Sequence, residues 1–173
     1  MSAEQKQYMI STKDDWGNSI VHLAAQTGDV AMMKLLVDDN IPLYEKNFIG
    51  SDILNISRIN RHIELFAFLI QFITPSYQML QDSMTNGEHE VSTLIRERIL
   101  KVQPWIIAIE ENDTHLARTL LLKPEAHEMN NTHFSALEYA LSKKRKDIVN
   151  LILNDEKVVI SIASIELAII NGY

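Results

Sequence analysis

The sequence predicts an all-α fold made of repeated helix pairs, and three observations support this. The 173 residues include only five glycines and four prolines, which argues against an all-β or a disordered chain. Apolar residues recur at helical spacing along most of the chain. A shift of 33 residues brings similar residues together, and such a period indicates stacked repeats: Gly17 falls on Gly50, Val30 on Ile63, and Met33 on Phe66.

The clearest motif lies over residues 17–29, which read Gly-Asn-Ser-Ile-Val-His-Leu-Ala-Ala-Gln-Thr-Gly-Asp. The segment resembles the opening of an ankyrin repeat, Gly-x-Thr-Pro-Leu-His-x-Ala-Ala-x-x-Gly-His. The residues that match outright are Gly17, His22, Ala24, Ala25 and Gly28. The residues that depart from the pattern are Ser19, Ile20, Val21 and Asp29. The resemblance implies a solenoid of stacked helix pairs with short hairpin or loop connections.

The rest of the chain is interpreted as further, less ideal copies. We predict a polar N-terminal segment at residues 1–13 and an array at residues 14–173. The expected repeats are 14–46, 47–74, 75–102, 103–129, 130–157 and a partial repeat at 158–173. The array should be irregular in the middle, because Ser57 and Ser83 lie too close in sequence for a full connecting arm.

Each predicted first helix carries a small residue where neighbouring helices would pack closely. These residues are Ala24, Ala25, Ser57, Ser83, Ala108, Ala140 and Ala168. Gly28 suits a left-handed turn between helices. Arg61 takes its place in the second copy, so that turn should be less regular. The resemblance implies that His22 is a structural residue which hydrogen-bonds neighbouring backbone.

Composition narrows the class of function. A net charge of −7 and a pI of about 5.3 argue against nucleic-acid binding. The absence of cysteine excludes disulfides and thiolate sites, and fits a reducing compartment. No apolar run reaches the roughly 18 residues of a membrane span, and residues 1–15 lack the apolar core of a signal peptide. We therefore expect a cytoplasmic protein.

No motif predicts catalysis, a metal or a cofactor. Neither a His-Glu-x-x-His pattern nor a glycine-rich phosphate loop occurs. His89 lies between two glutamates in a predicted turn, and His115, His127 and His133 have no metal-ligand spacing. We expect no enzyme activity. The basic run over residues 143–146 has two interpretations: a solvated turn, or a small patch for an acidic partner.

The resemblance implies a protein partner, bound on the concave side by hairpin tips and exposed faces of the first helices. The partner-binding residues predicted on this basis are Trp16, Asn18, Leu23, Gln26, Phe48, Ile49, Ser51, Ile56, Ile59, Phe134, Tyr139 and Lys143. Large apolar side chains at such positions indicate an interaction site. The alternative is that Trp16 and Phe48 fold onto their own array as a cap and a filler.

The leading functional prediction is a protein–protein interaction module. One alternative is a targeting domain of a larger enzyme or effector, whose catalytic part lies outside this chain. Another is an enzyme built on residues 77–128. The isoleucine- and asparagine-rich composition is typical of AT-rich genomes, which fits a bacterial effector or viral host-interaction protein acting in the host cytoplasm. The final helix, at residues 161–172, lacks a partner helix and so could mediate association.

Overall fold

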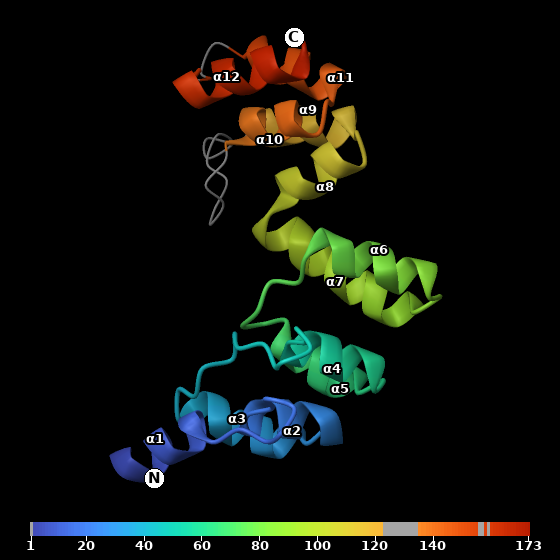
Figure 1. Ribbon diagram of the computed structural model, residues 1–173. Coiled ribbons are helices and arrows are strands. Elements are labelled where there is room, and N and C mark those ends of the chain that lie inside the picture. Colours follow the sequence, from blue (N-terminus) through green and yellow to red (C-terminus); the bar gives the residue numbers. More distant parts are fainter. Residues whose placement is uncertain (1, 123–134, 156–157, 159) are drawn as a thin grey trace. The chain divides into compact units, whose positions relative to one another are not determined.

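The computed structural model describes residues 2–122, 135–155, 158 and 160–173 (Figure 1). Over these residues the regular structure is entirely α-helical, with no β-strand. The prediction of an all-α fold is confirmed. The chain divides into two compact units, Met1–Arg98 and Ile99–Tyr173.

The first unit begins with a helix that the sequence interpretation did not anticipate. Helix α1 (Ala3–Ser11) lies in the segment predicted only as polar. Ser2 caps this helix, because its Oγ accepts a hydrogen bond from Gln5 N while Gln5 Oε1 accepts one from Ser2 N. Three helix pairs follow: α2 (Ile20–Thr27) with α3 (Val30–Asp38), α4 (Ile53–Ile59) with α5 (Ile63–Leu69), and α6 (Tyr77–Thr85) with α7 (His89–Val102). Helix α2 packs on both α3 and α4, and α5 packs on α3 and α4.

The second unit starts within the last turn of α7 and contains two complete pairs and a final helix. The pairs are α8 (Pro104–Glu110) with α9 (Thr114–Leu121), and α10 (Ala136–Ser142) with α11 (Lys146–Leu153). The final helix is α12 (Ile162–Asn171). Helix α10 packs on α8, α11 and α12, and α9 packs on α8 and α11. The core therefore lies between successive pairs, as in a solenoid.

The same turn closes all five helix pairs. A residue with positive φ ends each first helix, and the next residue donates its backbone N–H to a carbonyl five residues earlier. The accepting carbonyls belong to small residues singled out in the sequence: Ala24, Ser57, Ser83, Ala108 and Ala140. All five are buried, which lets neighbouring first helices approach closely.

The expectation of a less regular second turn is wrong. Arg61 has φ 60°, close to the 73° of Gly28, and His62 N donates to Ser57 O at 2.9 Å. The turn hydrogen bonds hold this arginine in the left-handed region, which costs an L-residue some free energy.

In three of these turns, the residue after the left-handed position also contacts the preceding pair. His62 Nε2 lies 2.9 Å from Gln26 O, and Glu88 accepts two hydrogen bonds from Arg58 Nη1, at 2.9 and 3.0 Å. In the second unit, Arg145 Nε donates to Ile109 O at 3.0 Å. Successive turns are thus linked by polar contacts as well as by the apolar core.

The connections between pairs differ in length, which makes the array irregular in the middle as predicted. Residues 39–52 join α3 to α4, whereas the shorter segment 70–76 joins α5 to α6. Only Gln103 separates α7 from α8. The long connection at residues 39–52 contains a loop that contacts the loop before α2, where Phe48 N donates a hydrogen bond to Trp16 O.

Candidate functional site

Two loops of the first unit are built alike, although they lie far apart in the sequence. In the first loop, Asp14 Oδ1 accepts hydrogen bonds from Trp16 N and Asn18 N, at 2.9 and 2.8 Å. Asp14 Oδ2 accepts another from Asn18 Nδ2, which is the main reason that the pKa of Asp14 is lowered. In the second loop, Asn47 Oδ1 accepts from Ser51 N at 2.8 Å. Both loops are short turns closed by a side chain.

Direct hydrogen bonds join these two loops. Asn47 Nδ2 donates to Asn18 Oδ1 at 2.9 Å, and Phe48 N donates to Trp16 O at 3.0 Å. The Phe48 ring lies against Gly17, where a Cβ atom would come within 2.6 Å of it. The two aromatic side chains are therefore presented from neighbouring, fixed backbones.

His22 anchors the start of α2 from the interior. Its Nδ1 accepts a hydrogen bond from Ser19 N at 3.2 Å and lies 2.9 Å from Ser19 Oγ. The side chain is fully buried, and burial lowers the pKa of the imidazole by disfavouring its charged form. A neutral, buried ring bound to its own helix start is a structural residue, in agreement with the prediction.

The Ankyrin repeat family matches residues 16–47, which contain α2, α3 and the arm that leads to the second loop. This chain contains an ankyrin repeat. No curated protein sequence matches it. Ankyrin repeats are generally protein–protein interaction modules and are typically non-catalytic, so the repeat directs attention to exposed surface.

Six of the predicted partner-binding residues are exposed in the first two helix pairs and the loops before them, and we call them together the loop-tip surface: Trp16, Leu23, Gln26, Phe48, Ile49 and Ile59. Trp16, Phe48 and Ile49 are 68%, 75% and 73% exposed. Leu23 and Gln26 belong to α2, and Ile59 ends α4, which packs on α2. Ser51 is half-buried at the base of the second loop.

Two other predicted surface residues lie in the interior, so their predicted exposure is wrong. Asn18 is buried because its side chain joins the two loops through Asp14 and Asn47. Ile56 is buried on the inner face of α4. The signal for Asn18 was present in the sequence, since Asp14 and Asn47 stand one ankyrin period apart.

The predicted residues of the second unit are engaged within it. Tyr139 is half-buried, and its hydroxyl donates to Glu110 Oε1 at 2.5 Å. Lys143 Nζ lies 2.6 Å from the same carboxylate oxygen and 5.4 Å from the centre of the Tyr139 ring. Phe134 lies outside the described residues.

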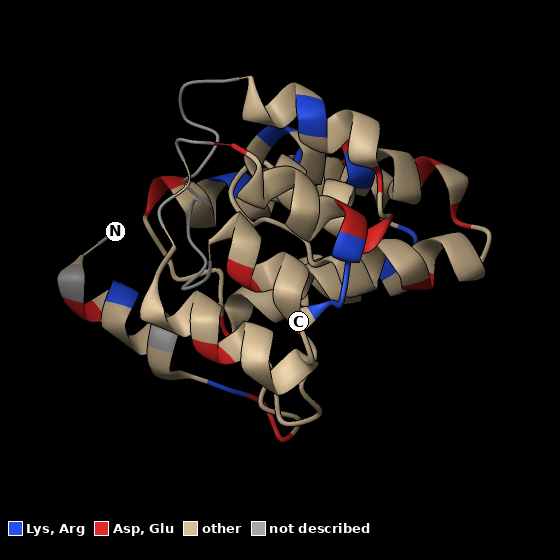
Figure 2. Cartoon of the chain, turned by 90° about the horizontal axis from the view of Figure 1, so that it is seen from above, with Lys and Arg blue, Asp and Glu red and all other residues tan. Residues whose placement is uncertain are grey.

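The basic run mainly serves the fifth turn. Lys144 is its left-handed residue, with φ 56°, and Arg145 donates to the carbonyls of Ile109 and Glu110. Lys146 Nζ lies 5.9 Å from the centre of the Tyr173 ring. These contacts favour the interpretation as a structural turn. Acidic and basic residues are interspersed along the ribbon (Figure 2).

Glu138 takes the position that His22 has in the first repeat. It caps α10 by accepting from Ser135 N at 2.8 Å, and it also accepts from Ser161 Oγ at 2.5 Å. The hydrogen bond from Ser161 is the main cause of its lowered pKa. This carboxylate therefore ties the start of α12 to α10.

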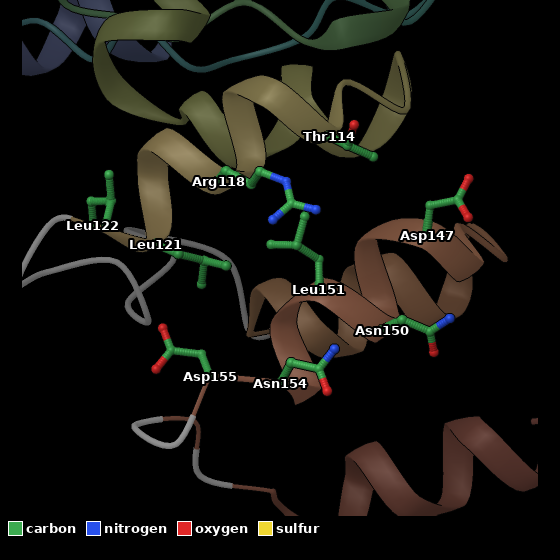
Figure 3. A pocket seen from close by; sticks show the side chains of 9 residues that line it. All are labelled: Thr114, Arg118, Leu121, Leu122, Asp147, Asn150, Leu151, Asn154 and Asp155. Carbon is green, nitrogen blue, oxygen red and sulfur yellow. The ribbon is translucent and has the colours of Figure 1, made fainter.

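Two hollows can be described from the residues that line them. A cavity of about 830 Å³ lies between α9 and α11, where Arg118 and Leu151 face each other (Figure 3). Its other lining residues are Thr114, Leu121, Leu122, Asp147, Asn150, Asn154 and Asp155, and none is a histidine. A second cavity, of about 410 Å³, lies beside the ion pair of Arg58 and Glu88, and His89 and Glu90 also line it.

The described ranges contain neither a cluster of metal ligands nor a membrane-spanning helix. No cluster of three or more His, Asp or Glu side chains there is arranged to hold a metal ion. His127 and His133, which the sequence put forward, lie outside those ranges. Nor is any described helix long and apolar enough to cross a bilayer.

Proposed function

We propose that the chain captures a partner protein through the loop-tip surface. The observation that carries this proposal is that Trp16, Phe48 and Ile49 are all exposed on two loops whose backbones are hydrogen-bonded to each other. Exposed apolar groups of this size generally mark an interaction site. Aromatic side chains are also the residues that most often dominate binding energy.

The backbone beneath these side chains is held in place. Asp14 and Asn47 close their own loops, and the hydrogen bond from Phe48 N to Trp16 O joins the two. A partner therefore meets a preformed surface. The entropy cost of ordering these loops on binding should be small. This rigidity, together with exposure, favours the binding role of Trp16 over the cap.

The chemistry of the surface indicates the kind of segment it accepts. Leu23 and Ile59 extend the apolar area from the loop tips onto α2 and α4, while Gln26 adds a polar group. Asp15 and Lys46 flank the loops with one charge of each sign. A partner segment with apolar side chains and no strong net charge fits this surface best.

The test is affinity capture with loop-tip variants. Trp16→Ala and Phe48→Ala should each abolish partner capture while the melting temperature stays nearly unchanged. Leu35→Ala is the matched control, since Leu35 is 60% exposed on α3, outside the loop-tip surface, and should leave capture intact. Retained capture in both variants, or a drop of several degrees in both melting temperatures, would overturn the proposal.

Two further elements belong to the same proposal. We place the protein in a reducing compartment, such as a host cytoplasm, because it contains no cysteine. We also regard α12 as a second association surface, because it exposes an apolar face.

A further inference from the structure

Two asparagines of the sequence are followed directly by glycine, in the pairs Asn86–Gly87 and Asn171–Gly172. In such a pair the glycine nitrogen can attack the side-chain carbonyl carbon of the asparagine, because the glycine has no Cβ atom to hinder the approach. Both pairs have the same place in the fold. Each glycine follows the end of a helix and has positive φ, 72° for Gly87 and 76° for Gly172.

The side chain of Asn86 is held less firmly than those of the comparable turn asparagines. Asn60 has the corresponding place in the second turn, and its Nδ2 donates to Ile56 O at 2.9 Å. Asn171 Nδ2 donates to Leu167 O, also at 2.9 Å. Asn86 is exposed, and its side chain makes no hydrogen bond to any other described residue. The Asn86 amide is therefore free to rotate toward the backbone.

The surroundings of Gly87 leave room for a reaction between the two residues. An added Cβ atom on Gly87 would have nothing within 4 Å, whereas one on Gly28 would collide with the His62 ring. The turn joins α6 to α7 (Figure 1), and Asn86 and Gly87 both line the cavity of about 410 Å³. The attack requires Gly87 N to leave Met84 O, which accepts its hydrogen bond at 3.1 Å. Loss of a single hydrogen bond at an exposed turn costs little.

We propose that Asn86 deamidates spontaneously, which makes the turn of the third pair a site of non-enzymatic modification. Gly87 N forms a bond to Asn86 Cγ and gives up its proton, and the side-chain nitrogen leaves as ammonia. The product is a succinimide ring. Water then opens this ring at either carbonyl: breakage of the new bond gives aspartate, and breakage of the original peptide bond gives isoaspartate. One water is consumed, one ammonia is released, and nothing is oxidised or reduced.

The isoaspartate product should weaken the contact between the second and third pairs. Its backbone runs through Cγ, so an extra methylene enters the turn that Glu88 N closes by donating to Ser83 O at 2.8 Å. Glu88 is also the residue that accepts two hydrogen bonds from Arg58. A displaced turn therefore loosens this ion pair. The aspartate product keeps the ordinary backbone and only adds a charge to a cavity that Arg61 also lines.

Incubation of the full chain at mildly alkaline pH, followed by mass spectrometry of its peptides, tests the proposal. The peptide that contains Asn86 should become about one mass unit heavier and separate into two products. Asn171 is the internal comparison, and should convert about fivefold more slowly, the factor that one ordinary hydrogen bond supplies. In denaturant the two rates should converge. No conversion of Asn86, or equal rates of the two asparagines in the folded chain, would overturn the proposal.

Thermal unfolding of the incubated protein tests the consequence. The natural chain should lose a few degrees of melting temperature as isoaspartate accumulates. Asn86→Gln is the matched control, because glutamine would have to close a larger ring and reacts far more slowly, so its melting temperature should stay constant. Fresh Asn86→Asp, with the added charge and an ordinary backbone, should unfold close to the fresh natural chain. An equal fall in incubated Asn86→Gln would overturn the assignment to this turn.

Discussion

The imidazole ring of His62 lies directly against Gly28. A Cβ atom on Gly28 would come within 2.5 Å of His62 Nδ1, while His62 Nε2 contacts the carbonyl oxygen of Gln26 at 2.9 Å. The turn of the first pair thus needs a glycine for two reasons: its φ of 73° and the ring that covers it.

Replacement of Gly28 by alanine should destabilise the first unit more than its backbone angle alone explains. We expect Gly28→Ala to cost about 2 kcal/mol or more, of which about 1 kcal/mol is left-handed strain. Gly87→Ala is the matched control, because Gly87 has φ 72° but nothing within 4 Å of an added Cβ atom. Urea unfolding of both variants measures the difference, and equal losses would mean that His62 moves aside freely.

Protonation of His22 should destabilise the protein at mildly acidic pH. Burial lowers the pKa of His22 in the folded state below its ordinary value of 6.5, so the unfolded chain binds the proton more readily. The free energy of unfolding is therefore unaffected by His22 above about pH 6.5. It falls as the pH drops from there toward the folded-state pKa of His22. The charges that face this ring are Glu45, which partly opposes the shift, and Lys13, which adds to it.

The measurement is the free energy of unfolding between pH 7.5 and about 5, compared with that of His22→Gln, which cannot titrate there. The natural chain should lose more stability over this range than the variant. Parallel curves would show that His22 does not titrate differently in the two states.

Loss of the Glu138 carboxylate should release α12 from α10. Glu138→Gln removes the charge that accepts from Ser161 Oγ and Ser135 N, and should cost about 1–3 kcal/mol. Because the pKa of Glu138 is lowered below 4.5, its stabilisation is present above that pH and is lost as the pH falls through the folded-state value. Hydrogen exchange of α12 amides should accelerate, whereas Glu166→Gln, an exposed substitution on α12, should leave their exchange unchanged.

The ion pair of Arg58 and Glu88 should contribute far more than that of Lys13 and Glu45. The Arg58 side chain is only 8% exposed, so Glu88→Gln leaves a buried charge without its partner and should cost about 3 kcal/mol. Glu45→Gln breaks a contact whose two side chains are about one third exposed, and should cost less than about 1 kcal/mol. Thermal unfolding of the two variants decides the order, and similar losses would contradict it.

The small residues at the turns could be found in the sequence because they reflect local chemistry. Small residues such as Ser83 and Ala108 recur just before each turn, and the carbonyl of each one accepts the turn hydrogen bond. The burial of Asn18 could not be read locally, because it depends on Asn47 in a loop one repeat away. Arg61 also departed from its local preference, because hydrogen bonds across the turn outweigh the cost of its left-handed angle.

The candidate surface was predictable in part for a similar reason. Trp16, Phe48 and Ile49 sit at loop tips, where position along the motif determines exposure. Tyr139 lies on α10 and Lys143 at the end of that helix, and Glu110 from the preceding pair engages both. Whether a side chain remains available thus depends on its neighbours in the adjacent helix pair.

The polar contacts between successive turns reach only one pair back, as those of His62, Glu88 and Arg145 show. Under a stretching force applied to its ends, such a chain has no single bond whose rupture releases everything. Each unit should instead lengthen in steps, one helix pair at a time, and recoil in the reverse order when the load is removed. A protein held at both ends would then extend gradually under load instead of rupturing in one event.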